Sequence, residues 1–178
     1  LVADFVRSHK FNGYIVWIVD SNELADQALM AFNSLWLLRG DRPTFSYRYF
    51  ADFNNDFEKC KPGVVFTSFS KCNAAINSRN EHDTKNFIHL CKKTSLVIVD
   101  EAQNLTPKQM KALITRAGPG TKLVCLGNIA QIDTPYLSET TCGLTYVVTR
   151  FRDWPHSGHI TLKRGERSRL ADFASENL

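Results

Sequence analysis

A short apolar run that ends in two carboxylates constrains the fold of this chain more than any other stretch. Leu96–Val99 contains no polar residue and leads directly into Asp100 and Glu101. An unbroken run rich in Val and Ile predicts a strand that is buried on both faces of a parallel sheet. Since ligands bind at the carboxyl ends of the strands in such sheets, we expect the two carboxylates at a ligand-binding edge.

The rest of the chain alternates between strand and helix patterns. Apolar runs predict further strands at residues 14–19, 45–50, 63–68, 122–128 and 159–162, and those at 14–19, 63–68 and 122–128 are expected to be buried. Helical spacing predicts helices over residues 21–39, from Lys71, from Thr106, over 143–151 and through Leu170. The first helix carries an apolar stripe expected to face the core: Leu24, Ala28, Leu29, Phe32, Leu35 and Trp36. Residues 80–85 are expected to form an exposed loop, and residues 87–91 a short amphipathic turn. This alternation predicts an α/β three-layer sandwich with a mostly parallel sheet.

The amino-acid composition indicates the class of protein but does not identify a function. The 178 residues fit one domain, and 43% hydrophobic with 22% charged residues is typical of a globular protein. A net charge of +4 permits contact with nucleic acid but does not establish it. Five scattered cysteines without a Cys-x-x-Cys pair favour free thiols and a cytoplasmic location. No run reaches the roughly eighteen apolar residues of a membrane helix.

Polar residues follow several of the predicted strands, and in a parallel sheet they would share one edge. These residues are Asp20, Thr67, Asp100 with Glu101, and Asn128. A carboxylate at such an edge can hold Mg²⁺ against the phosphates of a nucleotide, and its neighbour can orient an attacking water. We therefore expect Asp100 to bind the metal and Glu101 to polarise the water. Each of these polar residues is also a common helix cap, which is the alternative explanation.

Four other side chains are candidates for the same phosphate site. Gln103, Asn128 and Gln131 can hydrogen-bond a γ-phosphate or the attacking water, and Arg167 can offset developing phosphate charge. Further basic residues near the C-terminus could form a strip for nucleic acid, and an exposed helix face explains them equally well. These residues are Arg150, Arg152, Lys163 and Arg164.

A phosphate-cradling loop is missing from these 178 residues. The pattern G-x-x-x-x-G-K-[ST], whose backbone amides and lysine hold nucleotide phosphates, does not occur. Leu1–Arg7 has helical spacing without a cap and is expected to be the end of a longer helix. In a P-loop protein the phosphate-cradling loop precedes such a helix, so the gap is where a truncation would put it.

The second part of the chain closely resembles the PhoH family of P-loop ATPases, and most of all the PhoH module joined to a PIN ribonuclease domain in some bacteria. The resemblance covers about residues 97–178 and rests on several segments: Asp100–Pro107, Thr115–Gly118, Gly120–Lys122, Gly127–Asp133, Pro135–Leu137, Gly143–Val148 and Gly165–Ser168. It implies a RecA-like fold and an ATP-dependent, RNA-directed enzyme of the helicase kind, often assembled as a homo-oligomeric ring. It also adds Asp133 to the nucleotide-binding candidates. Where this chain has Asn128, the family commonly has Asp.

The first part, residues 1–99, resembles superfamily 2 helicases instead, through Ile15–Gln27 and Gly63–Ser70. The two resemblances meet at Asp100–Gln103, which suggests either a chimera or a divergent single family within one RecA-like domain. The leading hypothesis is a core that binds ATP and Mg²⁺ and acts on nucleic acid, with RNA favoured, but that is inactive alone. The alternative is a non-catalytic nucleic-acid-binding module or a chimeric scaffold.

Overall fold

The computed structural model describes residues 13–38, 45–48, 61–162 and 173. The chain divides into two compact units, Leu1–Val147 and Val148–Leu178. The expected C-terminal helix at Leu170 and the candidate Arg167 lie outside the described residues.

The first unit is built on a five-stranded sheet in which all paired neighbours are parallel. Its strands are β1 (Tyr14–Val19), β2 (Phe45–Arg48), β3 (Gly63–Ser68), β4 (Thr94–Val99) and β5 (Lys122–Cys125), in the order β2-β3-β1-β4-β5. Ile15 of β1 lies opposite Val64 of β3 on one side and Leu96 of β4 on the other, and Leu96 in turn lies opposite Lys122 of β5. The helicase-like and PhoH-like parts of the sequence therefore share one sheet.

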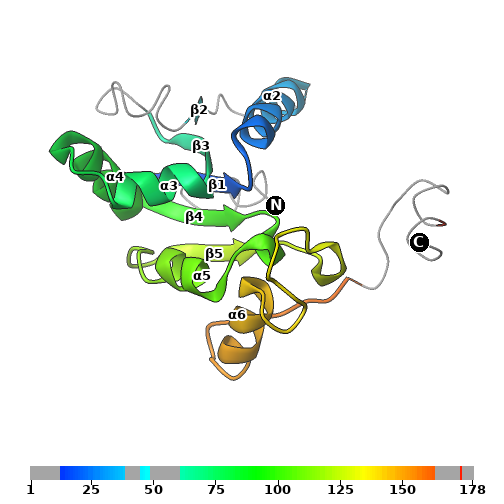
Figure 1. Cartoon of the computed structure of the whole chain (residues 1–178). Coiled ribbons are helices and arrows are strands. Elements are labelled where there is room, and N and C mark those ends of the chain that lie inside the picture. Colours follow the sequence, from blue (N-terminus) through cyan, green and yellow to red (C-terminus); the bar gives the residue numbers. More distant parts are fainter. Residues whose placement is uncertain (1–12, 39–44, 49–60, 163–172, 174–178) are drawn as a thin grey trace. The chain divides into compact units, whose positions relative to one another are not determined.

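Helices cover both faces of this sheet (Figure 1), as the sequence predicted. They are α2 (Asn22–Leu38), α3 (Phe69–Ile76), α4 (Glu81–Lys93), α5 (Pro107–Ile114) and α6 (Gly143–Phe151). Residues of α3, α4 and α5 join one core cluster, whereas those of α2 join the cluster on the other face. Two short 3-10 turns, η2 (Ala102–Asn104) and η3 (Ile129–Gln131), follow β4 and β5. The three-layer α/β sandwich is confirmed.

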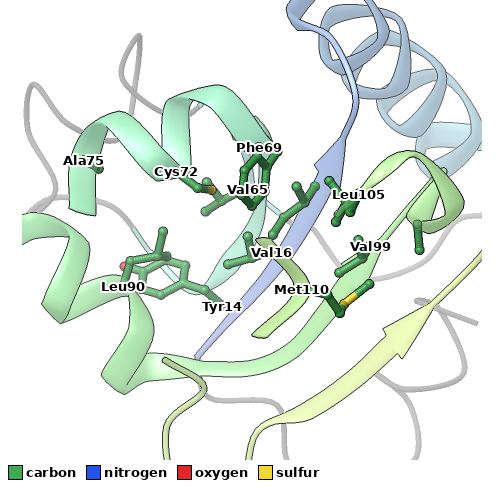
Figure 2. Packing of buried hydrophobic residues seen from close by; sticks show 12 residues of the cluster. Tyr14, Val16, Val65, Phe69, Cys72, Ala75, Leu90, Val99, Leu105 and Met110 are labelled. Atoms are coloured by element: carbon green, nitrogen blue, oxygen red, sulfur yellow. The ribbon is translucent and has the colours of Figure 1, made fainter. Parts of the chain in front are cut away.

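The larger core cluster contains residues from both parts of the sequence (Figure 2). Val16, Val65 and Val99 come from the first part, and Leu105 and Met110 from the second, and all five are buried. Burying such side chains removes about 25 cal/mol per Å² of apolar surface from water. The two parts are thus held together by a common core as well as by a common sheet.

The expected loop at residues 80–85 is wrong, because a helix begins there. Asn80 caps α4 by accepting a hydrogen bond from the backbone N–H of His82 at 3.0 Å. Glu81 lies in the first turn, and its carboxylate pairs with Lys85 at 2.7 Å. Acidic residues in the first turn and lysines in the last complement the helix dipole. The charged composition that suggested a loop is the solvent face of this helix.

Three further expectations need correction. In α2, Leu24 and Leu35 are 41% and 60% exposed, because a narrower stripe around the buried Ala25 faces the sheet. Strand β5 is only partly buried, since it is the edge of the sheet. Residues 159–162 form no strand, and all four are exposed. Among the described residues, no helix is long and apolar enough to span a membrane.

Candidate nucleotide-binding site

A polar pocket lies at the carboxyl ends of β1 and β4, where the sequence placed the site. The two strands remain paired to their ends, since the Asp100 N–H donates to the Ile18 carbonyl at 2.9 Å. The pocket is open and contains three carboxylates, and its lining residues are Asp20, Leu24, Glu101, Asn104, Gln131, Ile132 and Asp133. The sheet therefore brings together residues that are more than a hundred positions apart in the chain.

Glu101 enters this pocket from an unusual backbone conformation. Its φ of 51° and ψ of 39° are left-handed, which costs a non-glycine residue roughly 1–2 kcal/mol. The Glu101 N–H donates to Asp100 Oδ1 at 3.2 Å, and η2 starts at the next residue. The sharp turn separates the two carboxylates, so that Asp100 ends the strand while Glu101 faces the pocket. Both side chains are half-buried.

Gln103 fixes the position of the Glu101 carboxylate. Its side-chain amide is fully buried and donates from Nε2 to Glu101 Oε2 at 2.5 Å and to the Gln131 carbonyl at 3.3 Å. Its Oε1 accepts the Asn128 N–H at 3.1 Å. Hydrogen bonds to an ionised carboxylate are stronger than neutral ones, so this amide is a firm link. One side chain thus joins the turn after β4 to the loop after β5.

Gly127 makes room for this link. A Cβ at this position would lie 2.4 Å from Gln103 Oε1 and 3.0 Å from Leu144 Cδ2. Real side chains do not tolerate the first contact, so any larger residue would displace the amide. Gly127 thus belongs to the site although it does not line the pocket.

Asn104 is a site residue that the sequence reasoning missed. It is nearly buried, its Oδ1 accepts the Asp133 N–H at 3.2 Å, and its carbonyl accepts Thr134 Oγ1 at 3.2 Å. These bonds hold the loop that carries Asp133 against η2. Its place directly after Gln103 was the available signal, but only the fold shows which segment it binds.

The other predicted residues divide into two groups. Gln131 and Asp133 line the pocket, as Glu101 does. Asn128 is exposed, and its side chain caps η3 by accepting the Ala130 N–H at 3.1 Å, which is the capping role weighed as its alternative. Thr67 is fully buried, accepts a hydrogen bond from the Cys72 thiol and is not among the pocket residues.

The second part of the chain is similar to a known protein family. Residues 92–173 match the family model described as PhoH-like protein. Over 82 residues the chain is 51% identical to Protein PhoH2 of Bacillus subtilis, which covers 46% of this chain and 19% of that protein. Protein PhoH2 of Mycolicibacterium smegmatis is 34% identical over 84 residues, with 47% and 19% covered. The resemblance inferred from the sequence is confirmed, and the chain spans about a fifth of these relatives' length.

A solved helicase has a similar fold. The DUF1998 helicase MrfA, in its complex with DNA and AMPPNP, matches with a TM-score of 0.52 over 73% of this chain and 19% of that chain. At 14% identity this likeness concerns the fold alone, and it extends over more of the chain than the PhoH-like match does. The chain thus has a fold similar to that of a helicase, and its second part is PhoH-like.

Proposed function

We propose that this chain supplies the metal and water-activating end of an ATP site, in a protein that acts on nucleic acid. The observation that carries the proposal is the Glu101 carboxylate, held by a buried amide at the carboxyl ends of parallel strands. Asp100 would bind Mg²⁺, and Glu101 would polarise the attacking water. Asn128, Gln131 and Asp133 would face the phosphates, and Arg167, outside the described residues, would offset their charge.

The residues at this site fit a Mg²⁺ ion only when a bound nucleotide supplies further ligands. Among the described residues, no group of three or more His, Cys, Asp or Glu side chains could hold a metal by itself. Mg²⁺ in nucleotide sites is bound by one or two carboxylates, and substrate phosphates and waters complete its shell. Asp100 is half-buried, and its Oδ1 accepts the neighbouring Glu101 N–H. It is therefore suited to be one oriented ligand of an ion that the phosphates share.

Gln103 has a positioning role in this proposal. Its amide is fully buried and already bonded to three groups, so it would act on the phosphates through Glu101, Asn128 and Gln131. A displacement of η3 by the γ-phosphate would pull on the amide and hence on the Glu101 carboxylate. This supports a link between phosphate sensing and water activation.

The nucleic-acid part of the proposal comes from the family resemblance, from the net charge of +4 and from exposed arginines near the end of α6. RNA is favoured because the PhoH-like resemblance implies it, and assembly as a homo-oligomeric ring and a cytoplasmic location belong to the same proposal. No glycine-rich loop with its lysine is present among the 178 residues. We therefore expect them alone to hydrolyse ATP very slowly or not at all.

Mn²⁺ in place of Mg²⁺ tests the site directly, because its effect on water proton relaxation reports ternary complexes with ATP. Asp100→Asn should weaken Mn²⁺–ATP binding about ten-fold or more, whereas Glu101→Gln should bind within about three-fold of the parent, since the role proposed for Glu101 is on the water. Asp153→Asn, at an exposed position, is the matched control and should change nothing. Equal binding by the parent and Asp100→Asn would refute the metal assignment.

A second measurement separates the activity from the binding. Robust ATP turnover by the purified 178 residues that Glu101→Gln abolishes would contradict the expected inactivity. Salt-dependent binding of single-stranded RNA without any Mn²⁺–ATP complex would favour the non-catalytic binding module instead.

A further inference from the structure

One aromatic side chain near the pocket is displayed in a way that the ATP site does not explain. Tyr136 is fully exposed, at 102% of its reference area, and has a left-handed backbone with φ of 69°. A positive φ is uncommon outside glycine, and in a bulky residue it is an outlier. Such conformations persist only where the surroundings impose them, and they cluster at functional sites.

Hydrogen bonds on both sides impose this conformation. Before Tyr136, Thr134 Oγ1 donates to the Asn104 carbonyl at 3.2 Å, and the Leu137 N–H closes the turn onto the Thr134 carbonyl at 3.3 Å. After it, the Ser138 N–H donates to Thr141 Oγ1 at 2.9 Å. The segment between β5 and α6 is thereby tied to η2, beyond the ends of β4 and β5 (Figure 1). The ring is presented by an ordered turn beside the pocket.

The residues around the Tyr136 ring indicate which kind of ligand it could bind. Pro135 and Leu137 flank it, and the residues that follow form an exposed hydroxyl cluster in which Ser138 Oγ lies 3.1 Å from Thr140 Oγ1 and 2.9 Å from Thr141 Oγ1. The core of a protein interface is a contiguous apolar patch, which a single ring among hydroxyls does not provide. A flat base with polar edges fits both features, because it can stack on the ring and hydrogen-bond to the hydroxyls.

We propose that Tyr136 is a stacking platform for a base of a single-stranded nucleic acid, an inference that rests on the nucleic-acid part of the proposed function. A strand is favoured over the base of bound ATP because mononucleotide sites are concave, whereas this ring is fully exposed and is absent from the pocket lining. The strand would thus pass beside the loop that carries Gln131 and Asp133.

Fluorescence anisotropy with labelled single-stranded RNA and DNA of twelve nucleotides tests this role. Tyr136→Ala should weaken binding about five-fold or more, the range for loss of one stacked base, and Tyr136→Phe should stay within two-fold. Since the ring contacts no phosphate, the slope of log affinity against log salt should not change. Met30→Ala, which removes another large exposed apolar side chain, should bind like the parent.

Tyr136→Gly gives a readout that a merely structural tyrosine would not. Glycine adopts a positive φ without strain, so this variant should melt about 2 °C higher than the parent and yet bind the strand as weakly as Tyr136→Ala. A gain in stability together with a loss of binding would show that the strained backbone serves the ligand.

Other outcomes overturn the inference in distinguishable ways. If the parent and Tyr136→Ala bind the strand equally, the platform is refuted, and the proposed function stands. If the parent binds no strand at all, the inference and the nucleic-acid proposal both fail, while Mn²⁺–ATP binding decides the ATP site separately. Weaker ATP binding with unchanged strand binding would assign the ring to the nucleotide. A change of oligomeric state alone, seen by size-exclusion chromatography, would make Tyr136 a protein contact.

Discussion

Replacing Gln103 by leucine tests the central link of the site. The change keeps a similar volume but removes the buried amide that bonds Glu101 Oε2, the Gln131 carbonyl and the Asn128 N–H. A hydrogen bond to a charged group contributes about 1.5–3 kcal/mol and a neutral one about 0.5–1.5 kcal/mol. Because Asn128 and Gln131 are exposed and can turn to water, we discount the two neutral bonds and expect a loss of about 3 kcal/mol.

Urea unfolding followed by circular dichroism measures this loss. Gln27→Leu is the matched control, since it makes the same chemical change at an exposed position of α2 and should alter the free energy of unfolding by less than about 0.5 kcal/mol. Mn²⁺–ATP binding by Gln103→Leu under native conditions should fall less than in Asp100→Asn, because Gln103 does not touch the metal in our proposal. A stability change below about 1 kcal/mol would refute the view that this amide firmly holds the Glu101 carboxylate.

Two further predictions follow from the sterics of Gly127 and from the burial of Cys72. Gly127→Ala should lower the free energy of unfolding by about 2 kcal/mol, because its Cβ would lie 2.4 Å from Gln103 Oε1. Gly158→Ala is the control and should change it little, since nothing lies within 4 Å of a Cβ there. Equal melting temperatures for the two variants would contradict the clash. Burial raises the pKa of the Cys72 thiol to about 12, well above the value of about 8.5 for an unfolded thiol. Since the raised pKa belongs to the folded state, the buried neutral thiol makes its full contribution to the free energy of unfolding below about pH 8.5. That contribution is lost as the pH rises toward 12, by about 1.4 kcal/mol per pH unit. Urea unfolding from pH 7 to 10.5 should therefore show a steeper decline for the parent than for Cys72→Ala, and parallel declines would refute this assignment.

The sequence determined the class of fold because its strongest signals were local. The run Leu96–Val99 has the composition of a strand buried on both faces, and β4 lies at that position with neighbours on both sides. The Thr106 cap and Pro107 marked the start of α5, where Thr106 Oγ1 accepts the Gln109 N–H at 3.2 Å and the Gln109 side chain bonds back. Such features depend on residues a few positions apart, so they can be read without the fold.

Local composition misled where tertiary contacts decided the outcome. The charged segment after Asn80 became the first turn of α4, because α4 packs Leu90 into the core and leaves those charges in water. Leu35 followed the helical stripe of α2 and is nevertheless exposed, since only part of that helix faces the sheet. Amphipathic spacing states which residues share a face and leaves open how much of that face another element covers.

For the candidate site, the sequence by itself determined the carboxylates and their place at the end of a buried strand. Only the tertiary structure decided what surrounds them, because the partners come from distant parts of the chain. Gln103 was expected to face the phosphates, yet its amide is buried and bonded to a loop 25 to 28 residues further along. The exposure and positive φ of Tyr136 likewise result from hydrogen bonds that the fold brings together. Residue type determines which chemical groups are available, and contacts between distant segments determine where those groups lie and what they bond to.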